Sequence, residues 1–409
     1  MARILLLTPQ LPYPPHQGTS LRNLHMLKAL AQEHDITLLS FTEGGRAEDL
    51  SILKTYGVVL PPIPAPERTQ ITRLKQLFSA SLPDVAQRLI SPQYADALAD
   101  VLRNGEFDAV QVEGIELASY IEQVKAQAPG ISVILDCHNA ETELQRRARA
   151  IDLRAPARWP AALYSTIQIK RLAGFEAWAM HNSDAVIAVS EADRQYLSAL
   201  MPSGADDIKV IPNTIDVAEY DPRPGGKDKL AFDLVFTGKM DYRPNIDGVL
   251  WFADAVWPRL RESVPSITWA VVGQRPHTRL DVLRSKPGIT ITGFVPHIQP
   301  YLASSSIYIV PLRIGSGTRL KILEAMAAGL PIVSSPIGAE GFDIEDGREM
   351  ILAESPEEWV GSILSLLANE DRRSAIGAAA RNFAAKYDWR AIASPLNELY
   401  SRMLDGNDR

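Results

Sequence analysis

Short apolar runs alternate along the chain with longer segments whose apolar residues recur at helical spacing. In the first half, the runs that predict β-strands are Arg3–Thr8, Asp35–Phe41, Gly57–Leu60, Phe107–Glu113, Ser132–Asp136, Ala185–Ser190 and Ile208–Pro212. Helical patterns such as Ser20–Gln32 lie between them. This alternation predicts an α/β fold with a doubly wound parallel sheet, whose ligands bind beyond the carboxyl ends of the strands.

The same alternation starts again in the second half. Its predicted strands are Phe232–Thr237, Thr268–Val272, Gly288–Thr292, Ser306–Leu312 and Pro331–Ser334. Asp221–Lys229 (DPRPGGKDK) has the proline, glycine and charge content of a linker. A chain of 409 residues also exceeds one ordinary core. We therefore expect two Rossmann-like domains, residues 1–220 and 230–386, which face each other across a cleft that can enclose two substrates.

The most informative stretch is Ser306–Gly341, which predicts a buried strand, a glycine-rich turn and a helix. The turn is Gly315-Ser316-Gly317-Thr318, and Thr318 is placed to cap the helix. The helix is expected over Arg319–Ala328, where Gly329-Leu330-Pro331 stops it. Free backbone N–H groups and the helix dipole favour an anion at such a turn.

Three charged side chains follow this turn. Arg319 and Lys321 can reach a phosphate beside it, and Glu324 lies three residues after Lys321 on nearly the same helix face. For Lys321 and Glu324 alone, a surface ion pair is the simpler interpretation. Together with the turn and the buried strand, they favour a nucleotide-diphosphate site in which the carboxylate accepts hydrogen bonds from a ribose.

Composition narrows the class of protein. The chain is 46% hydrophobic and 22% charged, as soluble globular proteins are, and its formal net charge of −7 argues against binding nucleic acid. A single cysteine, Cys137, excludes an internal disulfide. No apolar run approaches the roughly 18 residues of a membrane span, and Ile4–Leu7 is too short for a signal peptide. The expected location is the cytoplasm.

The run GSGTRLKILEAMAAGLPIVSS closely resembles the donor-binding segment of retaining GT-B glycosyltransferases of the GT4-like group. A subgroup with Gly-Ser-Gly-Thr at this place looks similar, and it includes sugar transferases associated with bacterial exopolysaccharide and exosortase systems. That group carries two glutamates separated by seven residues, and Glu324 matches the second, which holds the ribose. The first falls on Ser316, so the donor sugar stays open. The resemblance implies the GT-B fold, with a last helix (residues 387–409) that packs back on the first domain.

The resemblance also implies a role for other residues. Lys239 and Arg243 would hold the diphosphate beside Gly238, and Gly18 would face the diphosphate and the acceptor. Residues implied to frame the donor and its base are Gly273, Arg275, Phe294, Val295, Gly315, Ser316, Gly317 and Thr318. Arg22 and Asn23 are acceptor candidates, and His138 would face the donor sugar as a catalytic residue with Lys321 and Arg319. The alternative interpretation of Lys239 and Arg243 is that each is an ordinary solvent-exposed charge on a loop between a strand and a helix.

The implied reaction moves a hexosyl group from a UDP- or GDP-sugar to a hydroxyl of a glycan or lipid-linked saccharide, in cell-surface polysaccharide synthesis. No Asp-x-Asp occurs, so we expect transfer without a metal or other cofactor, with Lys239, Arg319 and Lys321 supplying the positive field. Pro61–Arg103 mixes basic and apolar residues. It is either a solvated helical hairpin or a peripheral contact with the inner membrane.

Two other functions remain open at this point. A non-hydrolysing nucleotide-sugar epimerase would need paired carboxylates, but Glu113, Glu141 and Glu324 form no clear pair in the sequence. A non-catalytic GT-B subunit that binds nucleotide sugar is conceivable because the first glutamate of the motif is missing. A dinucleotide dehydrogenase and a P-loop kinase are disfavoured, because neither glycine fingerprint is complete.

Overall fold

The computed structural model describes residues 1–15, 17–42, 50–69, 81–154, 156–201, 208–220, 231–315 and 318–407. The chain divides into two compact units, Met1–Pro212 with Trp389–Arg409, and Asn213–Asp388. The division after Pro212 lies before the expected linker, whose residues 221–229 are outside the described part. Among the described helices, none has the length and apolar character needed to cross a membrane.

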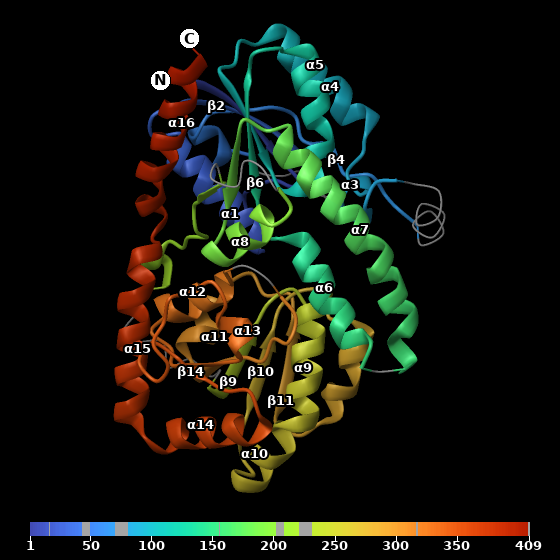
Figure 1. The fold of residues 1–409 in the computed structure, drawn as a ribbon. Coiled ribbons are helices and arrows are strands. Elements are labelled where there is room, and N and C mark those ends of the chain that lie inside the picture. The colour runs from blue at the N-terminus through green and yellow to red at the C-terminus, as the bar shows by residue number, and fades with distance from the viewer. Residues whose placement is uncertain are drawn as a thin grey trace. The chain divides into compact units, whose positions relative to one another are not determined.

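The first unit is built on a parallel sheet (Figure 1). Its strands are β1 (Arg3–Thr8), β2 (Asp35–Thr42), β3 (Val58–Val59), β5 (Ala109–Glu113), β6 (Ser132–Cys137), β7 (Ala185–Ala188) and β8 (Ile208–Val210). They follow the order β3-β2-β1-β5-β6-β7-β8, and β4 (Ile63–Pro64) pairs with β2. The order runs outward from β1 in one direction and from β5 in the other. The switch point of the sheet therefore lies between β1 and β5.

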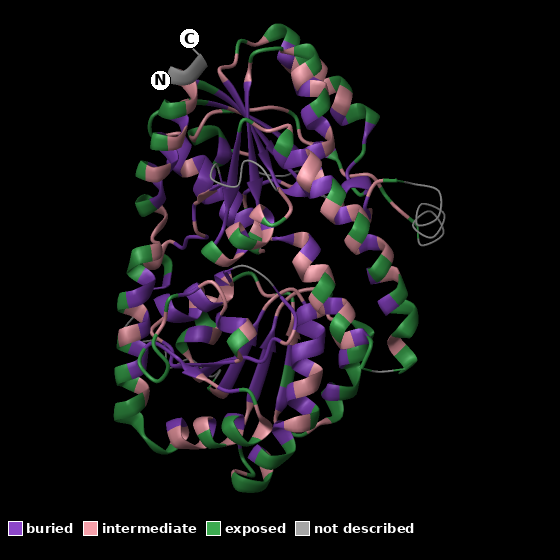
Figure 2. Ribbon diagram, in the orientation of Figure 1, coloured by how far each residue is buried: buried purple, intermediate pink, exposed green. Residues whose placement is uncertain are grey.

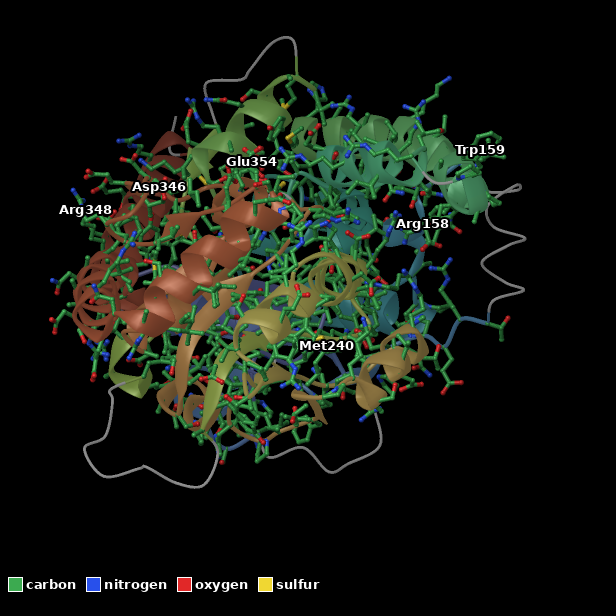
Figure 3. All side chains as sticks on the ribbon, turned by 90° about the horizontal axis from the view of Figure 1, so that it is seen from below. Arg158, Trp159, Met240, Asp346, Arg348 and Glu354 are labelled. Atoms are coloured by element: carbon green, nitrogen blue, oxygen red, sulfur yellow. The ribbon has the colours of Figure 1, made fainter. Side chains whose placement is uncertain are left out.

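Helices cover both faces of this sheet. They are α1 (Gly18–Leu30), α3 (Asp84–Gln87), α4 (Pro92–Asn104), α5 (Ile121–Gln127), α6 (Glu141–Asp152), α7 (Trp159–His181), α8 (Glu191–Ser198) and α16 (Ala393–Asn407), with 3₁₀ turns η1 (Leu53–Thr55), η2 (Ile115–Tyr120), η3 (Pro156–Arg158) and η8 (Trp389–Ile392). At the turn between α6 and α7, Trp159 is exposed beside Arg158 (Figure 3).

Alternate residues of β1 enter two separate cores, as the pleat of a strand requires. Leu5 and Leu7 join the core that contains the stacked rings of Phe41 and Tyr94, whose centroids are 4.2 Å apart. Ile4 and Leu6 join the core that includes Tyr400 of α16. Burial on both faces explains why these strands are continuous apolar runs, and the strands of both sheets are mostly buried (Figure 2).

The second unit has a six-stranded parallel sheet of order β11-β10-β9-β12-β13-β14. The strands are β9 (Phe232–Thr237), β10 (Trp269–Val272), β11 (Ile289–Gly293), β12 (Ser305–Val310), β13 (Ile332–Ser334) and β14 (Ile351–Leu352). Its switch point lies between β9 and β12.

The helices of the second unit are α9 (Arg243–Ala255), α10 (Trp257–Ser263), α11 (Gln299–Ala303), α12 (Leu320–Ala327), α13 (Pro336–Ala339), α14 (Pro356–Ala368) and α15 (Glu370–Ala384), with η5 (Val217–Tyr220), η6 (Thr278–Ser285) and η7 (Ala385–Tyr387). Its core includes an aromatic cluster in which Phe252 meets Trp269 and Trp359 edge-on, at centroid distances of 4.9 and 5.6 Å.

Gln17 is the cap residue of α1, and Ser20 Oγ accepts a hydrogen bond from the Gln17 backbone N–H (3.2 Å). The predicted cap of α12 was wrong. Arg319 is the cap residue of α12 and makes no side-chain cap bond, so Thr318 does not cap the helix. Its hydroxyl instead accepts from Asn213 Nδ2 (3.0 Å), a partner distant in sequence.

Candidate functional site

The loops after β9 and β12 carry most of the predicted donor-site residues of the second unit. Because these two strands flank the switch point, their loops diverge there and leave space for a ligand at the carboxyl edge of the sheet. Gly238 directly follows β9, and Gly315 and Lys321 belong to the turn and helix after β12. Ser316 and Gly317, also predicted for this site, lie outside the described residues.

Gly238 and Gly273 allow backbone and side chains to approach unusually closely. A Cβ on Gly273 would lie 1.7 Å from the carbonyl oxygen of Gly238. A Cβ on Gly238 would lie 2.7 Å from both Asn245 Nδ2 and Lys321 Nζ. Any side chain at either position would occupy the space that these groups share, so glycine is required at both.

Lys321 lies on the first turn of α12 and points back over the end of β9. Its Nζ donates a hydrogen bond to Asn245 Oδ1 (2.6 Å) and lies 4.3 Å from the centroid of the Phe236 ring. Asn245, in the first turn of α9, donates in turn from Nδ2 to the carbonyl oxygen of Lys239 (2.8 Å). The ammonium is therefore held by an amide and an aromatic face.

The surroundings of Lys321 disfavour its charged form. Burial lowers the pKa of Lys321 to about 7; the Arg319 charge acts in the same direction, and Glu324 opposes both. Burial raises the pKa of Glu324, although the hydrogen bond that its Oε1 accepts from Tyr220 (3.1 Å) and the Lys321 charge act against this. An incoming anion would favour the charged form of Lys321.

Other predicted residues lie in the same turn and helix as Lys321 and Glu324. A Cβ on Gly315 would lie 2.1 Å from a terminal nitrogen of Arg319, so that guanidinium packs against the turn. Asn213 Nδ2 bonds both the backbone oxygen (3.1 Å) and the hydroxyl of Thr318, which ties the end of the turn to residue 213. These contacts order the part of the turn that the structure describes.

Two cations, the partly buried Lys239 and the exposed Arg275, follow the ends of the neighbouring strands β9 and β10. Lys239 Nζ and Arg275 each approach Asp241, at 3.9 Å, and Arg275 adopts a left-handed backbone with φ of 52°. Arg243 is the first residue of α9 and is partly buried. Phe294, which is 58% exposed, and Val295 follow β11, the outermost strand, so the sheet places them away from Lys321.

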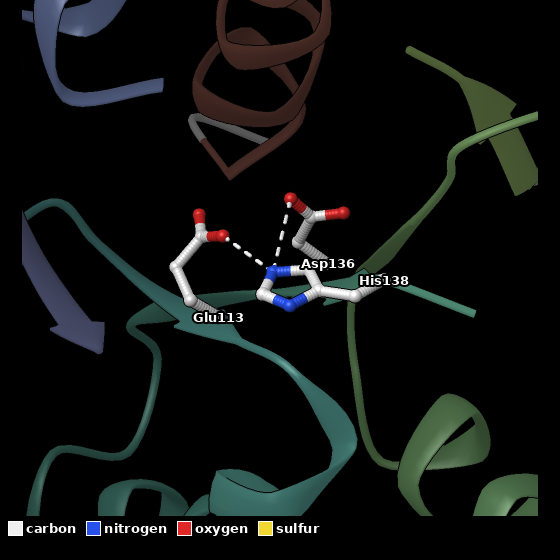
Figure 4. A group of neighbouring side chains, drawn as sticks. All are labelled: Glu113, Asp136 and His138. Atoms are coloured by element: carbon white, nitrogen blue, oxygen red, sulfur yellow. Dashed lines mark hydrogen bonds and ion pairs between the residues drawn. The ribbon is translucent and has the colours of Figure 1, made fainter. Parts of the chain in front are cut away.

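In the first unit, the predicted residues Arg22, Asn23 and His138 gather around two carboxylates, Glu113 and Asp136, at the ends of β5 and β6. Figure 4 shows His138 with these two carboxylates. His138 Nε2 lies 3.0 Å from Glu113 Oε2 and 3.9 Å from Asp136 Oδ2. Arg22 pairs with both oxygens of Asp136, at 2.7 and 2.8 Å. Its side chain is only 3% exposed, so Arg22 is a buried member of this cluster, and its contact with an acceptor stays a prediction.

Three pKa shifts follow from this geometry. Burial and the Asp136 charge raise the pKa of Glu113. Burial alone would raise the pKa of Asp136, but the charges of Arg22 and His138 and the hydrogen bonds to Asp136 together outweigh it, and the pKa is lowered. Burial alone would lower the pKa of His138, but the hydrogen bond to Glu113 and the charge of Asp136 outweigh it and the pKa is raised.

The ligand atoms of Glu113, Asp136 and His138 lie within 4.8 Å of one another, a spacing that a metal ion could use. Their oxygens, however, already have partners. Arg22 takes both oxygens of Asp136, and Glu113 binds His138 through one oxygen and Gln111 Nε2 through the other. A guanidinium on one carboxylate opposes a second cation. We therefore interpret the cluster as a hydrogen-bonded network and assign no metal to it.

The remaining predictions concern residues outside both groups. Gly18 is the exposed first residue of α1. In the segment suggested for membrane contact, Arg68 pairs with Asp84 (2.8 Å) and Arg88 with Glu116 (2.8 Å). Residues 70–80 of that segment lie outside the described part of the chain, so this contact stays a prediction.

Sequence reasoning missed Asn245, Tyr220 and Asp136 as members of these groups. Asn245 had a local signal, because it follows the strand, glycine and proline of the β9–α9 loop. Asp136 is paired with Glu113 across neighbouring strands, so the interpretation that the carboxylates form no pair was incomplete. Tyr220 precedes an undescribed segment and had no signal of its own.

Comparisons with known proteins agree with this architecture. The family described as Glycosyltransferase Family 4 matches residues 17–219, and the family described as Glycosyl transferases group 1 matches residues 231–369. The chain is 26% identical over 243 residues to a glycogen synthase of Mycobacterium tuberculosis, covering 55% of this chain and 56% of that protein. It thus spans little more than half the length of that relative.

Solved structures show the same fold. Sucrose-phosphate synthase from Thermosynechococcus elongatus has a TM-score of 0.78 at 16% identity, covering 99% of this chain and all of that one. HepE from Anabaena, in complex with UDP and glucose, has a TM-score of 0.70 at 15% identity and covers 98% of this chain and all of that one. This likeness supports the GT-B fold for the chain, with two Rossmann-like α/β domains.

Proposed function

Because the chain belongs to the family 4 and group 1 glycosyltransferases, we propose that it transfers a hexosyl group from a nucleotide-diphosphate sugar to an acceptor hydroxyl. The observation that carries this proposal is the setting of Lys321. Its ammonium is held against Asn245 and Phe236 at the switch point of the second sheet, where two glycines keep side chains away.

The protein needs only to bind and orient the substrates and to stabilise the leaving group, since a nucleotide-diphosphate sugar is already activated. The bond to the anomeric carbon breaks when the negative charge on the departing diphosphate is stabilised. We propose that Lys321 and Arg319 supply the compensating positive charge beside the turn after β12, together with Lys239 and Arg275, which follow the ends of β9 and β10. Losing one such cation costs about 3 kcal/mol, roughly a hundredfold or more in rate.

Glu324 is proposed to accept hydrogen bonds from the ribose hydroxyls. Tyr220 occupies one of its oxygens, which fixes the carboxylate in place beside Lys321. The sequence of this segment supports the assignment, because Glu324 matches the second glutamate of the Glu-x7-Glu pattern. Ser316 stands where the first would be, so the donor sugar is left to experiment.

We further propose that transfer is retaining, that it needs no metal, and that the acceptor is a glycan or lipid-linked saccharide of a cell-surface polysaccharide. The absence of Asp-x-Asp from the sequence and the resemblance of the donor segment support these points. The Anabaena HepE structure was determined with UDP and glucose, which makes UDP-glucose the first donor to test.

The direct test measures nucleotide binding and then transfer. Isothermal titration calorimetry with UDP, GDP and ADP identifies the base, using Lys321→Ala as the site variant and Lys286→Ala as a matched control. Lys286 pairs with Asp254 (3.1 Å) elsewhere in the same unit. Loss of binding in Lys321→Ala alone supports the site, whereas equal affinity in both variants excludes it.

Turnover separates transfer from the rival functions. The purified chain is incubated with UDP-sugars, with and without acceptor saccharides, in the presence and absence of EDTA, and the products are followed by NMR. Sugar transferred with the α configuration of the donor supports the proposal. An epimerised donor formed without acceptor would identify an epimerase, and binding without turnover would identify a non-catalytic subunit.

A further inference from the structure

We propose that Glu113 is a positioning residue that holds His138 as an imidazolium, with its second ring nitrogen presented as a hydrogen-bond donor to an oxygen of the substrate. This inference rests on the proposed function and adds to it the protonation state of His138 and the residue that maintains it. It concerns only the first unit, in which all the groups involved lie.

The position of the pair in the sheet favours a functional role. Glu113 ends β5, one of the two strands that flank the switch point, and His138 directly follows β6, the next strand. Glu113 pairs with Asp136 in the register of these strands, so both carboxylates and the imidazole meet at one edge of the sheet. Ligands of doubly wound sheets bind beyond this edge.

Charge balance within the cluster favours a protonated His138. Arg22 neutralises Asp136 through two hydrogen bonds. Glu113 also interacts with the carboxylate of Asp136 and, more weakly, with the charge of Arg22. Its remaining partners among the described residues are neutral: Gln111 Nε2 donates to Oε1, and the amide of Asn23, in the orientation that satisfies its hydrogen bonds, donates to Oε2 (3.0 Å). The imidazolium of His138 is the cation that would bond Glu113 directly and balance this second buried carboxylate, whose uncompensated burial is costly.

The two nitrogens of His138 have different surroundings. Nε2 points at Glu113 and Asp136, and Nδ1 lies on the opposite side of the ring (Figure 4). Among the described residues, no hydrogen bond to Nδ1 is found. The side chain remains 12% exposed. An imidazolium in this position has one N–H committed to the protein and the other available to a substrate oxygen.

A chain of hydrogen bonds anchors Glu113 from behind. Tyr400 of α16 donates from its hydroxyl to Gln111 Oε1, and Gln111 donates to Glu113. Tyr400 and Gln111 are both fully buried. Helix α16 thereby restrains the carboxylate of Glu113, which orients His138.

Titratable and polar groups on several neighbouring elements surround His138 and its partners. They are Glu113 and Gln111 on β5, Asp136 and Cys137 on β6, Arg22 and Asn23 on α1, Tyr400 on α16 and, beside Gly114, Glu116 of η2. Burial and the Arg22 charge lower the pKa of His138, while Glu113 and Asp136 raise it and prevail. Removing the Glu113 charge without changing its shape isolates the contribution of that carboxylate.

The variant that does this is Glu113→Gln, and Glu106→Gln, exposed and paired with Arg3, is its matched control. The imidazole of His138 is titrated by NMR in the wild type and both variants, with His138→Gln assigning its signal among the seven histidines. We expect the His138 pKa to fall by about one unit in Glu113→Gln, which is roughly a tenfold loss of the protonated form above both pKa values. The control should titrate like the wild type.

Turnover provides the second readout. In Glu113→Gln, kcat should fall by roughly tenfold at pH 8 and recover toward the wild-type value at acidic pH, with KM little changed. A loss of kcat that is equal at all pH values, or an unchanged His138 pKa, would overturn the proposal. So would titration of Glu113 rather than His138 in the wild type, since the proton would then belong to the carboxyl group.

Two provisions keep the test decisive. If Glu113→Gln does not fold, Tyr400→Phe removes a single hydroxyl from the same chain, and we expect a smaller pKa change in the same direction; no change would count against the anchor. If the wild type transfers no sugar, the proposed function fails, while the NMR titration still decides whether Glu113 holds the proton on His138.

Discussion

Lys321 Nζ lies 2.6 Å from Asn245 Oδ1 and 4.3 Å from the centre of the Phe236 ring, although these residues come from three different elements of the second unit. Asn245 is itself fixed by the hydrogen bond to the Lys239 carbonyl. A flexible lysine side chain is thus held in one position before any ligand arrives. Such preorganisation reduces the entropy lost when an anion binds.

Asn245→Ala should weaken the binding of UDP by roughly tenfold to a hundredfold, because a hydrogen bond to a charged group contributes roughly 1.5–3 kcal/mol. Calorimetric titration with UDP measures the change. Asn369→Ala is the control, since Asn369 caps α15 in the same unit through Arg372 N (2.9 Å). Equal UDP affinity in the wild type and Asn245→Ala would show that Asn245 does not hold Lys321 for the ligand.

Nucleotide binding should take up a proton at mildly alkaline pH. With a pKa of about 7, Lys321 is mostly neutral above pH 7 in the free protein, whereas an ordinary lysine stays charged to a pKa of 10.5. A bound diphosphate raises this pKa, so binding protonates Lys321 and affinity falls as pH rises above about 7. Well below pH 7, Lys321 is already charged in the free protein, so nucleotide binding adds no proton to it.

Calorimetry at pH 8 in two buffers of different ionisation enthalpy measures this proton uptake. Lys321→Arg should abolish it, because an arginine keeps its charge throughout this range. A proton uptake as large in Lys321→Arg as in the wild type would assign the effect to another group.

Gly273→Ala should destabilise the second unit and weaken nucleotide binding. The new Cβ would lie 1.7 Å from the Gly238 oxygen, so β9 and β10 must move apart where their ends form the site. Forced overpacking of this kind costs about 1–3 kcal/mol. Chemical denaturation measures the loss. Gly361→Ala in α14, where nothing lies within 4 Å of the added Cβ, should be neutral or slightly stabilising.

Arg22→Ala should destabilise the first unit by about 3–5 kcal/mol, because it leaves Asp136 buried without its partner. The matched control is Arg3→Ala, which removes an exposed pair with Glu106 and should cause no measurable loss. Denaturant midpoints of the two variants give the comparison. Equal midpoints would mean that the buried pair is replaced by water or by another cation.

Glu324→Gln should weaken the binding of UDP while leaving the binding of inorganic pyrophosphate almost unchanged. The carboxylate is proposed to accept from the ribose, which pyrophosphate lacks, and an amide is a weaker acceptor than a carboxylate. Competition titrations with the two ligands test this. An equal loss for both ligands would place Glu324 at the diphosphate, or indicate that Lys321 has moved.

Much of the fold could be predicted from the pattern of residues. Parallel strands such as β1 and β9 are continuous apolar runs because both faces are buried, and their bounds agree with prediction to within one or two residues for most strands. The residues that cap the helices were harder to predict from the sequence. Thr318 has the composition of a cap residue, yet its hydroxyl is taken by Asn213, which is distant in sequence.

The sequence by itself determined the two sheets, the position of the glycines at the strand ends and the cations of the turn after β12, because these depend on local spacing along one strand, turn or helix. Only the tertiary structure decided that Asn245 holds Lys321, and that Glu113, Asp136, Arg22 and His138 form one charged cluster. Those contacts join residues up to 114 positions apart, from Arg22 to Asp136, and no local pattern encodes them. The strand order and the packing of the helices bring them within hydrogen-bond distance.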